Sequence, residues 1–221
     1  MKIAVLGGSF NPVHIGHMAL ADEVCVSLGY DKVLFVPAST PPHKQMNGMT
    51  DACIRAKMVE LACSNDPRFE LETCEIDRGG VSYTYDTVCH LEEKYRGRLS
   101  GKIGLILGRD LLPSFHLWRK ADELARRCSL ILAARPHADA DEAFMNRAAG
   151  VYAECENAAE NSFSAETEPL FAGAVTLANE PLAVSSTGIR ARIFRKMAFQ
   201  YLVPSQVFKY ISDGKLYGSE C

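Results

Sequence analysis

The chain has 221 residues, 48% of them hydrophobic and 23% charged, and these proportions are ordinary for one globular domain with a sizeable core. The formal net charge of -3 argues against a broad basic surface for nucleic acid, although it allows a local anion pocket. No apolar run approaches the ~20 residues that span a bilayer, and a strand starts at once, so we expect neither a membrane span nor a secretory signal.

Short apolar runs alternate with helical patterns in chain order. Strands are predicted at 2–6, 32–36, 102–107, 129–134 and 174–178, with a half-exposed strand at 69–76. Helices are predicted at 18–28, 51–63, 84–95, 120–127, 140–155, 188–197 and 206–213, with Thr50 and Thr84 as N-caps. This alternation predicts an α/β fold: one Rossmann-like domain over 1–221, doubly wound, with a mostly parallel sheet, helices on both faces and a helical C-terminal portion from about 187.

The eight cysteines form no C-x-x-C pair, and no ligands for zinc cluster along the sequence. Most of them lie in apolar stretches, which indicates reduced, buried thiols in a cytoplasmic protein. We therefore expect no metal site formed by the chain itself.

The segment from Gly7 to His17 reads GGSFNPVHIGH and connects the first strand to the first helix. A glycine turn before a helix offers free backbone N–H groups and a positive dipole end to an anion. Gly7 and Gly8 allow close approach of a ligand, and His14 and His17, three residues apart, fall on one face of the helix's first turn. The dinucleotide fingerprint and the P-loop pattern are both absent, so the segment indicates another type of phosphate site.

The same segment resembles the signature G-x-F-D/N-P-x-H-x-G-H of the HIGH-type nucleotidyltransferases. Residues 185–190, SSTGIR, resemble the second motif of that superfamily, S-S/T-T-x-x-R. Further segments resemble its bacterial nicotinate-nucleotide adenylyltransferase branch: PPHK at 41–44, SYT at 82–84, GRDL at 108–111, and Trp118. The likeness covers almost the whole chain except about 138–170. It implies that AMP passes from ATP to the phosphate of nicotinate mononucleotide in NAD biosynthesis, by direct in-line attack with release of pyrophosphate.

The resemblance also implies roles for individual residues. His14, His17 and Arg190 would act in catalysis by stabilising the charge that develops on the phosphates. ATP would contact Gly7, Gly8, Ser9, Phe10, His14, His17, Gly108, Asp110, Ser185, Ser186, Thr187 and Arg190. Nicotinate mononucleotide would contact Lys44, Tyr83, Thr84 and Trp118, whose indole could stack on the pyridine ring. Mg²⁺ would arrive on the phosphates of ATP, since it keeps waters and uses few protein ligands. Asn11 stands where many members have Asp, which weakens a metal-binding role for that position.

Three other interpretations stay open at this point. Nicotinamide mononucleotide or phosphopantetheine could be the acceptor, although the phosphopantetheine branch usually carries Thr at the position of His14. A non-catalytic nucleotide sensor should have lost His17 or Arg190, and the chain retains both. The expected partners are ATP and nicotinate mononucleotide, with no nucleic acid and no membrane, and a homo-oligomer is left open.

Overall fold

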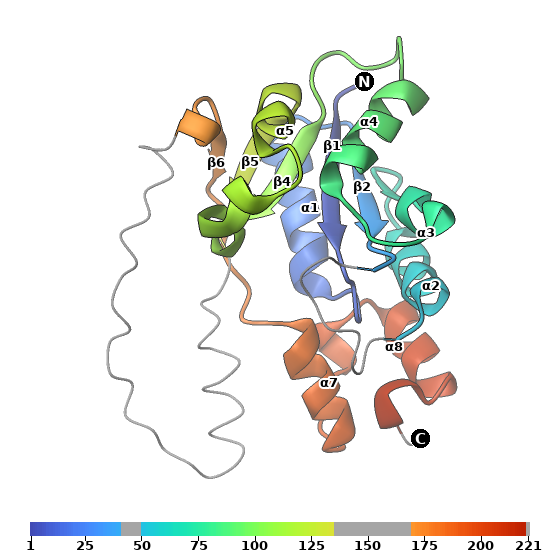
Figure 1. Ribbon diagram of the computed structural model, residues 1–221. Helices are drawn as coiled ribbons and strands as arrows, with labels where there is room; N and C mark the ends of the chain where they lie inside the picture. Colours follow the sequence, from blue (N-terminus) through green and yellow to red (C-terminus); the bar gives the residue numbers. More distant parts are fainter. Residues whose placement is uncertain (41–49, 135–168, 220–221) are drawn as a thin grey trace.

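The computed structural model describes residues 1–40, 50–134 and 169–219 (Figure 1). Within these ranges six parallel strands form one sheet in the order β3-β2-β1-β4-β5-β6. The predicted doubly wound parallel sheet is thereby confirmed, and its order is that of dinucleotide-binding folds. The strands are β1 Ile3–Gly8, β2 Lys32–Pro37, β3 Phe69–Leu71, β4 Gly104–Gly108, β5 Ser129–Ala133 and β6 Val175–Leu177.

Six of the described α-helices match predicted ones, and the described residues add the short helix α3 and four 3₁₀ helices. The α-helices are α1 Ile15–Leu28, α2 Ala52–Cys63, α3 Cys74–Arg78, α4 Thr84–Lys94, α5 Ala121–Arg127, α7 Ser186–Phe194 and α8 Ser205–Asp213. The 3₁₀ helices are η1 Arg109–Leu117, η2 Pro169–Phe171, η3 Gln200–Leu202 and η4 Leu216–Gly218. The helix predicted at 140–155 lies outside the described residues.

Helices cover both faces of the sheet, and alternate residues of each strand serve the two faces (Figure 1). In β1, Ala4 and Leu6 belong to the core that includes residues of α1, α2, α7 and α8. Ile3 and Val5 belong to the opposite core, which includes residues of α4 and α5. Because both faces are buried there, the four central strands β1, β2, β4 and β5 read as nearly continuous apolar runs instead of alternating ones.

The half-exposed strand predicted at 69–76 was wrong beyond Leu71, because the chain turns there into the short helix α3. Glu72 causes the change. Its backbone N–H still bonds the Phe35 carbonyl at 2.9 Å, but its carboxylate accepts the N–H of Cys74 at 3.0 Å, which favours a helix start over a longer ladder. The alternation of charged and apolar residues from Phe69 therefore does not correspond to a strand beyond Leu71.

Two predicted caps were also wrong by one position. The N-cap of α2 is Asp51, whose carboxylate accepts the N–H of Cys53 at 2.7 Å, so Thr50 lies outside the helix. The N-cap of α4 is Tyr83, and Thr84 is the first helical residue. Among the described cysteines, all free thiols, Cys25, Cys63, Cys74 and Cys128 are buried, in agreement with the prediction.

The direction of winding changes between the neighbouring strands β1 and β4. The helix that follows β1 packs on one face, whereas η1 and α5, which follow β4, pack on the other. In open α/β sheets, ligands bind in the crevice that this arrangement leaves at the carboxyl ends of the two strands. Gly8 and Gly108 are those ends here. No helix in the described part of the chain is long and apolar enough to cross a membrane.

The two cores predict that replacing a buried leucine by alanine costs much more stability than replacing an exposed one. Leu34→Ala, at a fully buried site in β2, should lower the free energy of unfolding by about 2–5 kcal/mol through lost contacts and a cavity. Leu117→Ala, at a site 67% exposed, should change it by no more than about 0.5 kcal/mol. Urea unfolding measures both, and equal losses would contradict the assignment of Leu34 to the core.

Candidate active site

The turn between β1 and α1 is built around the buried ring of Phe10. Its backbone adopts φ 47°, a left-handed conformation that residues other than glycine rarely adopt. The ring packs against Phe35 and, edge-on, against His17, with centroids 5.7 and 5.0 Å away. A Cβ at Gly8 would lie 3.1 Å from this ring, a tight contact, so glycine gives the ring room under the end of β1. The turn is thus anchored by the side chain of Phe10, a residue that the sequence analysis names only among the contacts of ATP.

The two predicted histidines meet at the start of α1. This helix begins at Ile15, three residues earlier than predicted, so His14 is its N-cap and His17 lies in its first turn. Their imidazole centroids are 3.7 Å apart with ring planes at 30°. The backbone N–H of His14 donates to His17 Nδ1 at 3.2 Å. Because that N–H can only donate, Nδ1 is the acceptor, and the proton of the neutral His17 ring resides on Nε2.

The second motif docks directly on this turn, although the two are far apart in sequence. Ser186 Oγ donates to the Pro12 carbonyl at 2.8 Å, and Arg190 Nη1 donates to the Asn11 carbonyl at 2.7 Å. Ser185 caps α7 by accepting the N–H of Gly188 at 3.0 Å. The starts of α1 and α7 therefore lie at one turn, where both dipoles favour an anion. Thr187 is part of the same group, since its Oγ1 accepts a bond from Arg190 at 3.3 Å.

Asn11 is a second point at which distant segments meet the turn. Its side-chain Oδ1 accepts the hydroxyl proton of Tyr217 at 2.7 Å and the N–H of Thr50 at 3.4 Å. Burial raises the pKa of Tyr217, which keeps this hydroxyl protonated as a donor. An amide oxygen therefore orders the turn by hydrogen bonds, and this use needs no metal at Asn11.

Arg55 is a residue of the site that the sequence analysis missed. It is fully buried on α2, and its guanidinium donates to the carbonyls of Ser9 at 2.7 Å, Ala38 at 2.7 Å, Ser39 at 3.2 Å and Thr50 at 3.0 Å. Burial lowers its pKa, but an arginine stays protonated in proteins. The turn after β1 and the segment after β2 thus share one buried cation.

A signal for Arg55 exists in the sequence. It precedes Met58 and Val59 by three and four residues, and both are fully buried on the same helix. Residues at that spacing share a helix face, so Arg55 falls on the apolar stripe. A buried arginine needs several hydrogen-bond acceptors, so an arginine on an apolar stripe can be recognised from the sequence as a structurally important residue.

Three of the residues predicted for nicotinate mononucleotide lie at the start of α4 and just after η1, two elements that Arg119 joins. Tyr83 and Thr84 lie at the start of α4, and Trp118 follows η1, half-buried with its ring 5.2 Å from that of Phe115. Arg119 links the two elements, because it bonds Asp86 at 2.9 Å and places its guanidinium 5.0 Å from the Tyr83 ring centroid. The predicted Lys44 lies outside the described residues. Asp110 is exposed in the first turn of η1, directly after β4.

Ser39 and Thr40 connect these two groups of residues. The N–H of Ser39 donates to Ser82 Oγ, and the N–H of Ser82 donates to the Thr40 carbonyl, each at 3.0 Å. The Ser39 carbonyl also accepts a bond from Arg55, which holds the phosphate turn at Ser9. Hydrogen bonds through Arg55 and Ser39 thus connect the turn at Ser9 to Ser82, just before α4.

A 3-2-1-4-5-6 parallel sheet with two helix starts and paired imidazoles at its switch point defines a nucleotide-binding α/β protein. Residues 5–192 match the cytidylyltransferase-like family. The chain belongs to this family, and its full-length relatives place it in the nicotinate-nucleotide adenylyltransferase branch.

These relatives cover nearly all of the chain. A Treponema pallidum protein named "Probable nicotinate-nucleotide adenylyltransferase" is 40% identical over 99% of this chain and 100% of its own length. The Bacillus subtilis nicotinate-nucleotide adenylyltransferase is 35% identical over 99% of both chains. The Plasmodium falciparum nicotinic acid mononucleotide adenylyltransferase complexed with NaAD has the same fold, with a TM-score of 0.68 over 99% and 98% of the chains at 17% identity.

The contacts of Arg55 predict a large loss of stability when it is removed. Arg55→Met should lower the free energy of unfolding by at least about 3 kcal/mol, because a buried acceptor without its donor costs about 1–3 kcal/mol. The matched control is Lys57→Met on the same helix, which breaks only an exposed pair with Glu60, worth about 0.3–0.5 kcal/mol. Urea unfolding of the two variants compares them, and similar losses would show that the carbonyl contacts of Arg55 contribute little.

Proposed function

We propose that this protein transfers the adenylyl group of ATP to nicotinate mononucleotide and releases pyrophosphate, producing deamido-NAD. The observation that carries the proposal is the docking of the 185–190 motif on the turn that holds His14 and His17. Two helix starts and two imidazoles then surround one anion site at the switch point of the sheet. The names of the full-length relatives support the same reaction.

The chemistry requires no nucleophile from the protein. A phosphate monoester has a second pKa of about 6, so the acceptor phosphate is largely dianionic at neutral pH. One of its oxygens attacks the α-phosphorus of ATP and forms a new P–O bond, while the bond from the α-phosphorus to the bridging oxygen breaks. The electron pair leaves with pyrophosphate. The protein must align two polyanions and stabilise the charge that develops between them.

His17 is the side chain best prepared for that task. Since its Nδ1 accepts the His14 N–H, Nε2–H is the donor that it can offer to an oxygen on the α-phosphorus. Phe10 holds the ring edge-on from the other side. His14 acts next to it, with its imidazole 3.7 Å from that of His17. No proton needs to leave either ring during the transfer.

The β- and γ-phosphates would bind at the start of α7. Ser185, Ser186 and Thr187 surround its first backbone N–H groups, and Arg190 adds a positive charge beside the turn. Gly7, Gly8, Ser9 and Phe10 would contribute backbone groups, and Gly108 and Asp110 would face the ribose. MgATP is the form of the substrate that we propose, because Mg²⁺ uses phosphate oxygens and water and needs few protein ligands.

Acceptor choice would depend on Tyr83, Thr84 and Trp118, together with Lys44. An indole offers a flat apolar surface to a pyridine ring, and a lysine matches a carboxylate or phosphate. These features favour nicotinate over nicotinamide mononucleotide. We also propose a cytoplasmic location, since the described cysteines are free thiols.

Pyrophosphate release with MgATP and one acceptor at a time tests the proposal. Nicotinate mononucleotide should support turnover and yield deamido-NAD, identified by its mass, whereas nicotinamide mononucleotide and phosphopantetheine should support much slower release. Turnover with another acceptor but none with nicotinate mononucleotide would refute the assignment. ATP binding without release in all three arms would instead favour a sensor.

Removing the imidazole of His17 should slow the chemical step selectively. His17→Ala should lower kcat by at least ~100-fold, in line with the loss of one preorganised donor to the transition state. His116→Ala, an exposed histidine in η1, serves as the matched control and should keep kcat within about twofold. Steady-state kinetics and thermal unfolding are measured for both, and a folded His17→Ala enzyme with near-normal kcat would exclude the proposed role.

A further inference from the structure

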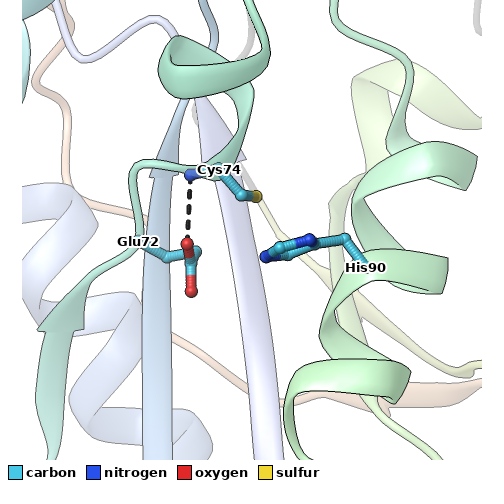
Figure 2. A group of neighbouring side chains, drawn as sticks. All are labelled: Glu72, Cys74 and His90. Carbon is cyan, nitrogen blue, oxygen red and sulfur yellow. Dashed lines mark hydrogen bonds between the residues drawn. The ribbon is translucent and has the colours of Figure 1, made fainter.

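A second cluster of reactive side chains lies away from the phosphate turn, between β3, α3 and α4. In the described part of the chain, Glu72, Cys74 and His90 are the one group of three or more metal-ligating residues, with ligand atoms all within 4.8 Å of one another. Figure 2 shows the His90 ring directed at the other two side chains. Glu72 and Cys74 are buried, whereas His90 is exposed, so the group can be reached from solvent.

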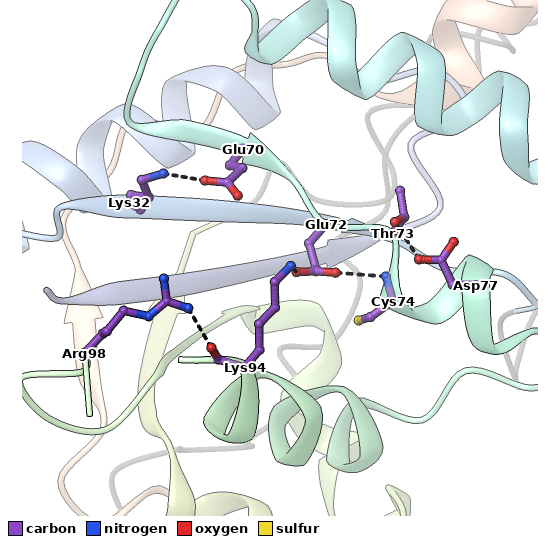
Figure 3. Close-up of polar contacts among 8 residues, drawn as sticks. All are labelled: Lys32, Glu70, Glu72, Thr73, Cys74, Asp77, Lys94 and Arg98. Carbon is purple, nitrogen blue, oxygen red and sulfur yellow. Dashed lines mark hydrogen bonds and ion pairs between the residues drawn. The ribbon is translucent and has the colours of Figure 1, made fainter. Parts of the chain in front are cut away.

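The backbone holds the two buried donors in place. Glu72 directly follows β3, Cys74 is the first residue of α3, and a hydrogen bond of 3.0 Å joins the carboxylate of Glu72 to the N–H of Cys74. Figure 3 shows that Lys94 approaches the other carboxylate oxygen, at 2.6 Å. Each of these oxygens carries a second lone pair, which can bind a cation. His90 and Lys94 lie one turn apart on α4, so both reach the same carboxylate region.

We propose that Glu72, Cys74 and His90 bind one divalent transition-metal ion, for which Zn²⁺ is the best match. Sulfur, imidazole nitrogen and carboxylate oxygen are the ligands of tetrahedral zinc sites, and three of them leave the fourth position to water. The thiolate disfavours Mg²⁺ and Ca²⁺, which take oxygen ligands. The site is therefore distinct from the Mg²⁺ that accompanies ATP.

The charges are compatible with one dication. A thiolate and a carboxylate supply two negative charges, and the Lys94 ammonium is paired with one oxygen of the Glu72 carboxylate. Burial raises the pKa of the Cys74 thiol to about 12, so the metal-free protein holds the thiol protonated. Coordination forms the metal–sulfur bond and releases that proton to solvent.

A metal at this place would fasten the end of β3 and the start of α3 to α4. Tyr83 is the N-cap of α4 and Thr84 its first residue, so the ion would steady the element that faces the proposed acceptor. The proposal does not depend on adenylyl transfer, because it rests on donors outside the crevice. Its test can therefore fail or succeed whatever the substrate is.

Cobalt(II) is the probe of choice, because a cobalt–thiolate bond gives a charge-transfer absorption band that oxygen and nitrogen ligands do not. The full-length chain, reduced and stripped with a chelator, should bind one equivalent of Co²⁺ with this band, and Zn²⁺ should displace it. Cys74→Ser should abolish the band. Cys53→Ser removes an exposed thiol outside the cluster and should leave it unchanged.

His90→Gln gives an independent readout, since His90 is exposed and its substitution does not threaten folding. In a competition titration this variant should bind Zn²⁺ at least ~100-fold more weakly. Removing a residue that only hydrogen-bonds a metal ligand already costs about 10–100-fold, and His90 would be a ligand itself. A wild-type chain without the charge-transfer band would overturn the proposal. So would a band that survives in folded Cys74→Ser, or unchanged Zn²⁺ affinity in His90→Gln.

Discussion

The buried guanidinium of Arg55 is the interaction on which the crevice depends. A buried cation is stable only when its N–H groups are hydrogen-bonded. Here the Arg55 guanidinium donates to four carbonyls from three segments of the chain. Those carbonyls belong to the turn after β1, the segment after β2 and Thr50, which precedes the N-cap of α2. The same contacts that stabilise the charge therefore set the distance between the phosphate turn at Ser9 and the chain at Ser39, which leads by hydrogen bonds to Ser82.

The turn itself is held by side chains from the C-terminal part of the chain. Asn11 accepts Arg190 at its carbonyl and Tyr217 at its side chain, while Pro12 accepts Ser186. These donors satisfy the backbone carbonyls of Asn11 and Pro12 and bring the start of α7 to the start of α1. A chain with a formal charge of -3 can thus attract polyanions through local donors and dipoles. Broad surface charge contributes little.

Two groups of polar side chains in the molecule differ in what they offer to a ligand. At the crevice, histidines and an arginine offer hydrogen-bond donors, a set suited to phosphate oxygens. Between α3 and α4, Glu72, Cys74 and His90 offer lone pairs, a set suited to a cation. The second cluster includes His90 of α4, and the segment just before α4 is held by the bonds of Ser82 to Ser39 and Thr40.

Periodicity and turn chemistry in the sequence determined the sheet, its helices and the motif residues around Gly7–His17 and 185–190, since these are local patterns of apolar spacing, glycine and capping residues. The predicted strands that lie in described residues, apart from β3, agree within two residues. Only the tertiary structure decided how Arg55 and Tyr217 contribute and that Glu72, Cys74 and His90 converge, which sequence spacing had argued against. Contacts of this kind depend on which strand ends and helix faces pack together, and such long-range geometry leaves no periodic trace along the chain.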